Sequence, residues 1–293
     1  MLPAMCRFAL YLGPPIRLSA LVTEPSNSII HQSYDAKERE EPLNGDGFGV
    51  AWYAPELREA PAVFKSVTPA WNDVNLLNLA PVTVSRCLLA HVRAATPGLG
   101  VTQLNCHPFV RGRLAFMHNG AIAGFRDLRR RLQQGLSDRE FAAIQGSTDS
   151  EHILALIADA YDRATDAATE LERMATAVEA SIREVEHLRA SAGIEAPSFL
   201  NLALTDGVRA VVTRYVSPGA GVPPHSLYSA RGRLVIEEGE GRLIDHEEEE
   251  PAVLIASEPL GPRRRWEAVP FNNMVLVDGD GTTTLRPLVD EAS

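Results

Sequence analysis

The chain is poor in cysteine, in long apolar runs and in basic charge, and each shortage argues against a class of protein. Its three cysteines in 293 residues are an odd number without a pairing pattern, which fits a reducing compartment. No apolar run approaches the roughly 18–20 residues of a membrane span. No basic region precedes an apolar stretch at the N-terminus, so the sequence predicts no signal peptide. We therefore expect a cytoplasmic protein with no membrane partner.

Nucleic-acid and nucleotide-phosphate sites are not favoured either. The formal net charge is −10, whereas binding to phosphates needs clustered Lys and Arg. The glycine-rich segment 44–49, Asn-Gly-Asp-Gly-Phe-Gly, precedes a strand instead of joining a strand to a helix, so it is not a dinucleotide fingerprint. No Gly-Lys-Ser/Thr follows it, so it is not a P-loop. Its three glycines indicate a backbone that must approach another group closely.

The remaining composition is that of an ordinary globular protein. Hydrophobic residues make up 45% and charged residues 23%, and the length is near the upper size of one domain. No repeat or low-complexity linker divides the chain. Strand-like segments come first, helical segments follow, and strands return after Pro197. Both groups of strands need partners, so the order predicts one domain with two packed sheets and helices outside.

The predicted elements alternate with clear turn signals. A strand over 6–12 is expected to end at Gly13-Pro14-Pro15, and 25–42 is expected to be a long loop. Asn119-Gly120 is expected to close a strand over 113–118 as a hairpin turn. Helices are predicted over 72–79, 125–134 and, in two pieces, from about 146 to 187. Further strands are predicted over 50–53, 62–67, 82–92, 199–204, 210–215, 227–230, 234–237, 252–256 and 274–278.

Two chemistries can be built from single residue types, and neither has a supporting pattern. His91, Cys106, His107 and His118 are zinc-ligand types, but their spacing forms no Cys-x2-Cys or His-Glu-x-x-His pair. A Cys/His/Asp triad using Cys87 or Cys106 would need a nucleophile-like local sequence, which neither cysteine has. Cys87 lies in the apolar part of a predicted strand and is interpreted as core packing. We expect no metal and no cofactor.

A third chemistry uses several segments together. If the residues before Cys6 are absent, that residue carries both a thiol nucleophile and a free α-amine that can act as the base. Arg93, at a strand end, can hold a carboxylate through two hydrogen bonds. Asp149 can hold an ammonium group, and Asn119 with Gly120 can donate to a developing oxyanion. Together they select a substrate with an α-amino acid head and a reactive carbonyl further out, as in glutamine and γ-glutamyl compounds.

At this point the sequence resembles a known family. The motifs, in chain order, are Met-Cys-Arg-Phe at 5–8, Asn-Gly-Asp-Gly-Phe-Gly at 44–49, His-Val-Arg-Ala-Ala-Thr at 91–96, Asn-Cys-His-Pro-Phe at 105–109, Phe-Met-His-Asn-Gly at 116–120 and Gly-Ser-Thr-Asp-Ser-Glu at 146–151. They resemble the class II glutamine amidotransferases. Ser257-Glu258-Pro259 and Trp-Glu-Ala-Val-Pro at 266–270 resemble the free-standing members, including the γ-glutamyl hydrolases of the ergothioneine pathway.

The resemblance implies a fold and a set of roles. The fold is the α+β, four-layer αββα sandwich of two antiparallel sheets found in N-terminal-nucleophile hydrolases. Cys6 matches the nucleophile, and Asn119 with Gly120 matches the oxyanion hole. The remaining matches are substrate contacts: Arg93 for the α-carboxylate with Thr96 beside it, Asp149 for the α-amine, and Asp46, Gly47 and His118 lining the site. His91, Asn105, His107 and also His118 are interpreted as hydrogen-bonded scaffold, while His118 stays a candidate substrate contact.

The expected activity is hydrolysis of the γ-amide of glutamine through a Cys6 thioester, with ammonia passing to a synthase on a separate chain. One alternative is a γ-glutamyl hydrolase for a larger conjugate, such as an ergothioneine precursor. Another is a protein that binds glutamyl ligands without catalysis. The five residues before Cys6 depart from the family pattern, because an acylated Cys6 nitrogen is not a base. We expect translation from Met5 or self-cleavage before Cys6, leaving one domain over 6–293.

Overall fold

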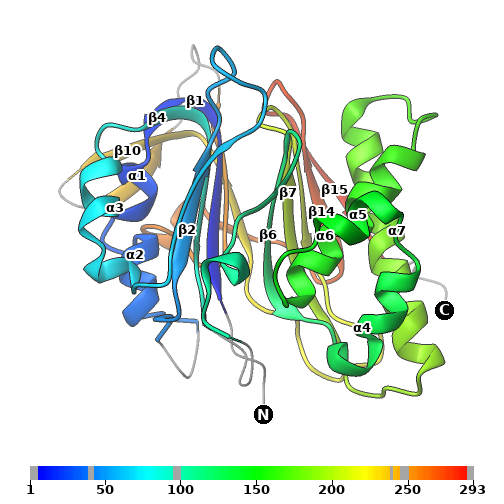
Figure 1. Ribbon diagram of the computed structural model, residues 1–293. Coiled ribbons are helices and arrows are strands. Elements are labelled where there is room, and N and C mark those ends of the chain that lie inside the picture. The colour runs from blue at the N-terminus through cyan, green and yellow to red at the C-terminus, as the bar shows by residue number, and fades with distance from the viewer. Residues whose placement is uncertain (1–5, 39–42, 95–99, 238–239, 245–250, 289–293) are drawn as a thin grey trace.

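Two antiparallel sheets face each other at the centre of the molecule and carry helices on their outer surfaces (Figure 1). The computed structural model describes residues 6–38, 43–94, 100–237, 240–244 and 251–288. One sheet has seven strands in the order β13-β9-β12-β1-β4-β2-β3, and the other has six in the order β15-β14-β8-β7-β6-β5. The expected four-layer αββα sandwich of two antiparallel sheets is therefore confirmed.

The seven-stranded sheet is built around β1 at its centre. Its strands are β1 (Arg7–Arg17), β2 (Phe48–Trp52), β3 (Ala62–Ser66), β4 (Val84–Val92), β9 (Tyr228–Arg231), β12 (Val253–Ala256) and β13 (Glu267–Ala268). Short helices cover its outer face: α1 (Ser19–Val22), α2 (Ile29–Tyr34) and α3 (Val74–Leu79), with a 3-10 turn η1 (Ala70–Asn72). A separate hairpin joins β10 (Arg233–Glu237) to β11 (Glu240–Ile244).

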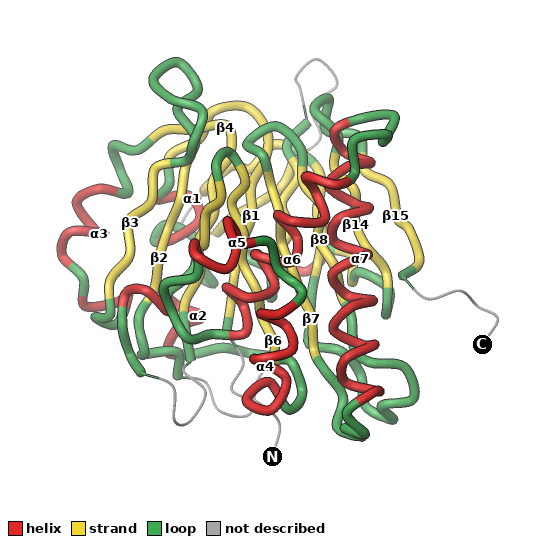
Figure 2. Tube along the Cα trace, turned by 45° about the vertical axis from the view of Figure 1, so that its right-hand side comes forward, coloured by secondary structure: helices red, strands yellow, loops and turns green. Residues whose placement is uncertain are grey.

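The six-stranded sheet carries the longer helices. Its strands are β5 (Phe109–Arg111), β6 (Leu114–Ala121), β7 (Phe199–Thr205), β8 (Ala210–Arg214), β14 (Asn273–Val277) and β15 (Thr283–Pro287). Its helices are α4 (Phe125–Gln134), α5 (Asp138–Ala143), α6 (Asp149–Arg163) and α7 (Glu170–Ser191). Two further 3-10 turns are η2 (Gln103–Asn105) and η3 (Arg263–Arg265). Figure 2 shows α4, α6 and α7 lying together on one side of the strands.

Three apolar clusters fill the three interfaces between the layers. One lies between the two sheets and includes Phe8, Leu10, Met117 and Val212. A second lies between the seven-stranded sheet and its short helices, and a third lies between the six-stranded sheet and α4, α6 and α7. Side chains on a strand alternate between its two faces, so residues two positions apart point to the same face. The apolar cluster to which one residue belongs therefore shows where the residue two positions away points.

Three local predictions are wrong. Strand β1 runs on through Gly13-Pro14-Pro15 instead of ending there, and an irregular register between Leu12 and Ile16 accommodates the two prolines. The segment 25–42 is not one loop, because it contains the helix α2. Ser28 caps this helix by accepting a hydrogen bond from the His31 N–H. Asn119-Gly120 is not a hairpin turn but lies inside β6, paired with Leu200 and Asn201 of β7.

Candidate active site

Cys6 immediately precedes β1, at the end of the space between the two sheets. Phe8, Leu10 and Leu12 belong to the cluster between the sheets, so Cys6, two residues before Phe8, lies on the same side of the chain. Its side chain is buried, and the thiol lies 3.7 Å from the carbonyl oxygen of Ala94. The proposed nucleophile therefore faces the opposite sheet.

The neighbouring residue, Arg7, points the other way and anchors this end of the strand. Its Nε donates to Glu258 over 2.7 Å, and both side chains are almost completely buried. A second guanidinium nitrogen donates to the carbonyl oxygen of Cys6 over 2.9 Å. The Glu258 carboxylate also accepts the backbone N–H groups of Lys37 and Glu38, over 2.9 and 3.1 Å. One buried ion pair thus joins Cys6, the segment after α2 and the Ser257-Glu258-Pro259 motif.

Asn119 and Gly120 face Cys6 from the opposite sheet. Ala115 and Met117 of β6 belong to the cluster between the sheets, so Asn119 points the same way. The Asn119 side chain is fully buried, and neither atom of its amide has a hydrogen-bond partner among the residues described. Gly120 has φ +152°, and a Cβ there would lie 1.8 Å from the carbonyl oxygen of Phe199. The strand therefore needs glycine beside the unpaired amide.

Arg93 follows β4 and is held by the glycine-rich segment. Its N–H donates to the Gly47 carbonyl oxygen over 2.9 Å, and its own carbonyl oxygen accepts the Asp46 N–H over 3.1 Å. The guanidinium, which is buried, reaches the Asp46 and Gly100 carbonyl oxygens only at 3.4 and 3.5 Å. These long contacts leave the Arg93 donors suited to a carboxylate. Thr96 lies outside the described residues.

Asp149 begins α6 and reaches back to the end of β6. Its carboxylate accepts the Ile122 N–H over 2.9 Å and the Ser150 N–H over 2.8 Å. The capping hydroxyl of the helix is that of Thr148, which accepts the Glu151 N–H. Since Ile122 is two residues after Gly120, Asp149 is tied to the strand that carries the predicted oxyanion donors.

Asn105 connects these segments. Its amide nitrogen donates to the Gly100 carbonyl oxygen over 2.9 Å, and its amide oxygen accepts the Ser147 N–H over 2.9 Å. It thereby links the segment after Arg93 to the N-terminus of α6. The prediction that Asn105 is hydrogen-bonded scaffold is confirmed.

Three buried histidines lie on or beside the predicted oxyanion strand, and all are held neutral. Burial lowers the pKa of His91 to about 3 and lowers the pKa values of His107 and His118 as well. His118 contacts the Ser150 hydroxyl and the Phe199 carbonyl oxygen, each at 3.0 Å, so it faces α6 and not the space between the sheets. These contacts agree with the interpretation of His118 as hydrogen-bonded scaffold. His107 stacks on His91, and neither of its ring nitrogens has a partner among the described residues.

The alternative nucleophiles and the metal site find little support in this geometry. Cys87 is completely buried, and its burial raises the thiol pKa to about 12, as the core-packing interpretation requires. Burial also raises the pKa of Cys106, whose thiol contacts the Ser66 and Thr102 carbonyl oxygens. Within the described ranges, no three His, Cys, Asp or Glu side chains converge as metal ligands.

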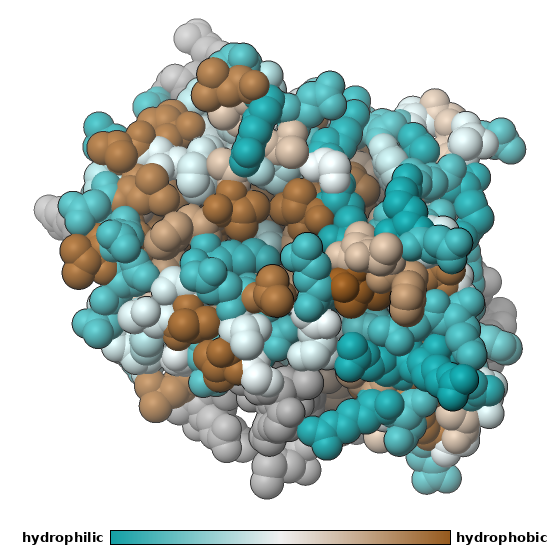
Figure 3. Space-filling view, in the orientation of Figure 1, coloured by the Kyte–Doolittle hydropathy of each residue, from teal (hydrophilic) through white to brown (hydrophobic). Residues whose placement is uncertain are grey.

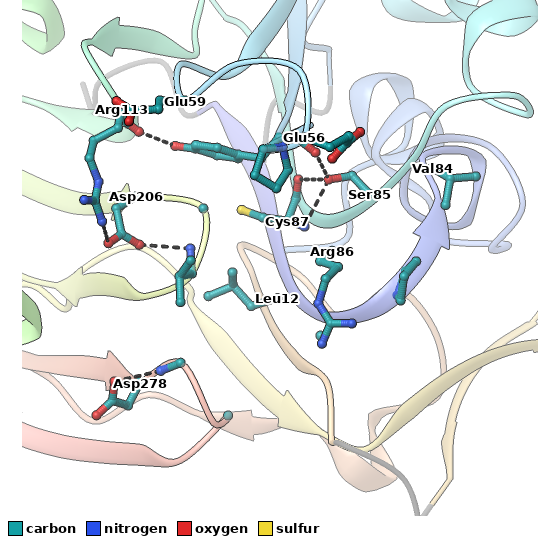
Figure 4. Close-up of a pocket in the computed structure, with 18 of the residues that line it drawn as sticks. Leu12, Glu56, Glu59, Val84, Ser85, Arg86, Cys87, Arg113, Asp206 and Asp278 are labelled. Carbon is teal, nitrogen blue, oxygen red and sulfur yellow. Dashed lines mark hydrogen bonds and ion pairs between the residues drawn. The ribbon is translucent and has the colours of Figure 1, made fainter.

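A cavity of about 580 Å³ opens at the other end of the sheets and is separate from this site. Its walls include Leu12, Cys87, Arg113 and Asp206 (Figure 4). Leu12 lies six residues beyond Cys6, on the strand that begins at the candidate site, and Arg113 immediately precedes β6. Among the described residues, none of those predicted to act on a substrate lines this cavity.

Comparisons with known proteins agree with the site. The family profile described as "Glutamine amidotransferases class-II" matches residues 20–292. The chain belongs to the class II glutamine amidotransferases. It is 40% identical to "Probable glutamine amidotransferase DUG3" of Saccharomyces cerevisiae, over 98% of this chain and 85% of that protein. It is 27% identical to the gamma-glutamyl-hercynylcysteine sulfoxide hydrolase of Mycolicibacterium smegmatis, over 97% of this chain and the whole of that protein.

Solved structures of the amidotransferase family share this fold. A glutamine aminotransferase class-II domain protein from Silicibacter pomeroyi superposes with a TM-score of 0.65 at 25% identity, covering 96% of this chain and 99% of that one. The glutamine phosphoribosylpyrophosphate amidotransferase of B. subtilis superposes with a TM-score of 0.61 at 15% identity, covering 98% of this chain and half of that one. The second likeness concerns the fold alone.

Sequence reasoning predicted Asn105 as scaffold but assigned no role to three other residues that hold this amidotransferase site together, namely Arg7, Glu151 and Glu258. Arg7 and Glu258 were visible only as members of short motifs, 251 positions apart. Glu151 stood in the predicted helix start, and its carboxylate accepts the Gln145 and Gly146 N–H groups. The only sign of the Arg7–Glu258 pair in the sequence was a charged residue inside each of two motifs. That the two residues pair becomes visible only in the folded structure.

Proposed function

We propose that this amidotransferase hydrolyses the γ-amide bond of glutamine or of a γ-glutamyl compound through Cys6. The Cys6 α-amine takes the thiol proton, the thiolate attacks the γ-carbonyl carbon, and the carbonyl electrons move onto oxygen. When the tetrahedral intermediate collapses, the C–N bond breaks and the leaving amine takes a proton from the Cys6 α-ammonium. Water then cleaves the glutamyl thioester, releasing glutamate and restoring the thiol.

The observation that carries this proposal is the buried, unpaired amide of Asn119. A buried polar group without a partner costs about 1–3 kcal/mol, so its presence in β6 calls for a function. Asn119 faces the seven-stranded sheet, whose central strand β1 follows Cys6. The next residue, Gly120, has a backbone N–H that can serve as a second donor. Both donors suit an oxyanion that forms only during the reaction, and one such donor is typically worth about 3 kcal/mol.

The substrate's amino acid head is assigned to two charged residues. The Arg93 guanidinium would hold the α-carboxylate, with Thr96 beside it, and the Asp149 carboxylate would hold the α-ammonium. Asp46 and Gly47 would line the site behind Cys6. The structure supports the arrangement in two ways: the Arg93 contacts are long, and Asp149 is only half-buried.

The base requires that Cys6 be the first residue of the working protein, with the domain spanning 6–293. An α-amine titrates near pH 8, which suits proton transfer at neutral pH. Residues 1–5 lie outside the described residues. We propose that they are not translated or are removed, and the intact-mass spectrum of the native protein tests this point.

The acceptor and the location are proposed on indirect grounds. All three cysteines are free thiols, which supports a cytoplasmic location, and no helix within the described segments is both long and apolar enough to cross a membrane. Apolar side chains gather on the face that carries α3, where Val74 and Leu77 are exposed (Figure 3). This surface supports contact with a separate ammonia-accepting synthase. The hydrolase among the relatives favours the alternative of a larger γ-glutamyl conjugate.

The decisive experiment measures ammonia from glutamine and glutamate from γ-glutamyl conjugates with one set of variants. Cys6→Ala should abolish both activities, and Asn119→Ala should lower kcat about 10²- to 10³-fold. Cys87→Ala is the matched control and should retain activity, because Cys87 is a packing residue. Activity in Cys6→Ala would refute the mechanism. Glutamine binding without turnover, in protein that begins at Cys6, would establish the non-catalytic alternative. The preferred substrate decides between glutaminase and conjugate hydrolase.

A further inference from the structure

Two ring side chains, those of His91 and Tyr53, form polar bridges across the apolar layer between the sheets. At the candidate-site end, the His91 Nε2 lies 3.2 Å from the carbonyl oxygen of His118. At the other end, the Tyr53 hydroxyl lies 2.8 Å from the Arg113 carbonyl oxygen and 3.1 Å from that of Thr205. His91 and Tyr53 belong to the seven-stranded sheet side, and their acceptors belong to the six-stranded sheet. Apolar contacts are non-directional, whereas a hydrogen bond fixes position.

The first bridge lies between the two halves of the proposed catalytic machinery. His91 pairs with Phe8 on β1, two residues after Cys6. Its acceptor is the carbonyl of His118, the residue immediately before Asn119. A single side chain thus spans from β4, the strand beside that of the nucleophile, to β6, the strand of the oxyanion donors.

The His91 ring is fixed from its other side by His107. The two rings stack at 4.0 Å between centroids. His107 fits there because Gly49, which pairs with His91 across β2 and β4, has no side chain. A Cβ at Gly49 would lie 2.0 Å from the His107 carbonyl oxygen. The glycine-rich segment therefore makes room for the residue that orients the bridge.

In this bridge, His91 can only donate a hydrogen bond to the His118 carbonyl oxygen. A carbonyl oxygen accepts, so the His91 proton lies on Nε2 and the ring is neutral. The Nδ1 atom has no partner in the described part of the chain. Burial lowers the pKa of His91 to about 3, so the ring stays neutral at the pH where the thiol reacts.

We propose that His91 is a positioning residue, which sets the separation between Cys6 and the oxyanion donors Asn119 and Gly120. This inference rests on the proposed function for its kinetic consequence but not for its structural one. His91 acts through the His118 carbonyl and takes no part in proton transfer. A displacement of about 1 Å between reacting groups costs on the order of 100-fold in rate, so losing the bridge should lower kcat and leave KM nearly unchanged.

The test compares His91→Phe with Tyr53→Phe, each of which removes one bridge hydrogen bond from a buried ring. We expect His91→Phe to lower kcat about 100-fold with KM within about threefold, and Tyr53→Phe to keep kcat within about threefold. His91→Gln, which restores an amide donor, should recover part of the loss. The pH profile of His91→Phe should keep the shape of the wild-type profile. In the Asn119→Ala background, His91→Phe should cost less than it does in the wild type.

A structural measurement keeps the two proposals separable. Backbone amide resonances of Asn119 and Gly120 should shift in His91→Phe and stay in place in Tyr53→Phe, whether or not the wild type shows activity. Equal kcat losses in the two Phe variants, a loss confined to KM, or unmoved Asn119 and Gly120 resonances would each overturn the positioning role. Absence of activity in the wild type would instead overturn the proposed function, and the resonances would still decide whether His91 forms the bridge.

Discussion

Replacing Glu258 by Ala should destabilise the protein strongly, because it leaves a buried guanidinium without its counter-charge. The Arg7 and Glu258 side chains are 0% and 1% exposed, and the N–O distance is 2.7 Å. Breaking such a pair by removing one partner typically costs about 3–5 kcal/mol of the free energy of unfolding. The Lys37 and Glu38 N–H groups also lose their acceptor, which adds to the loss. Urea denaturation followed by circular dichroism would measure the change.

Glu172→Ala supplies the matched control. Its carboxylate pairs with Arg286, but these side chains are 42% and 32% exposed, so water replaces the lost interaction. We expect a change within about 1 kcal/mol. Glu258→Gln, which keeps the shape and one acceptor but loses the charge, should fall between the two. If Glu258→Ala loses no more stability than Glu172→Ala, the Arg7–Glu258 pair is not the anchor of the Cys6 strand.

Two further predictions concern the residues around the first bridge. Acidification from pH 7 to 5 should remove about 2 kcal/mol through His91 alone, because its pKa of about 3 in the folded protein lies below the roughly 6.5 of the unfolded chain. The contribution of His91 to the free energy of unfolding is present above pH 6.5 and is lost as the pH falls towards 3. Urea denaturation at several pH values should show a weaker fall in His91→Phe than in the wild type. An equal dependence of stability on pH in the two proteins would contradict the buried neutral ring. Gly49→Ala should cost about 3 kcal/mol or more in thermal unfolding, since its Cβ meets the His107 carbonyl oxygen at 2.0 Å. Gly135→Ala, whose Cβ meets only the Leu132 carbonyl oxygen at 3.6 Å, should be nearly neutral, and a similar loss in both would show that the contact at Gly49 does not matter.

Sequence patterns predicted the layers because each layer depends on local periodicity. The helix over 125–134 matches α4, and the predicted strand over 199–204 lies within β7. The errors came where tertiary contacts overrode a local rule. Gly13-Pro14-Pro15 usually ends a strand, but this strand is the centre of a sheet and continues past an irregular register.

The Asn119-Gly120 prediction shows the same limit within the candidate site. The pair is a strong hairpin signal when the flanking strands are neighbours in sequence. Here its partner strand, β7, lies about 80 residues further along the chain, and Gly120 is needed because the Phe199 carbonyl oxygen occupies the place of a side chain. The residue types indicated the chemistry, but their backbone conformation depended on a distant strand.

The arrangement of the site explains why single motifs did not reveal which segments its supporting residues join. Each segment with a proposed chemical role is held by a residue from another motif: Cys6 by Glu258 through Arg7, and the N-terminus of α6 by Asn105. Such contacts join residues tens to hundreds of positions apart, and no local pattern records them. A motif in this protein therefore combines groups of two kinds, those that would meet the substrate and those that fix a neighbouring motif. Removing the first kind should reduce activity in a folded protein, whereas removing the second, as in Glu258→Ala, should reduce stability as well.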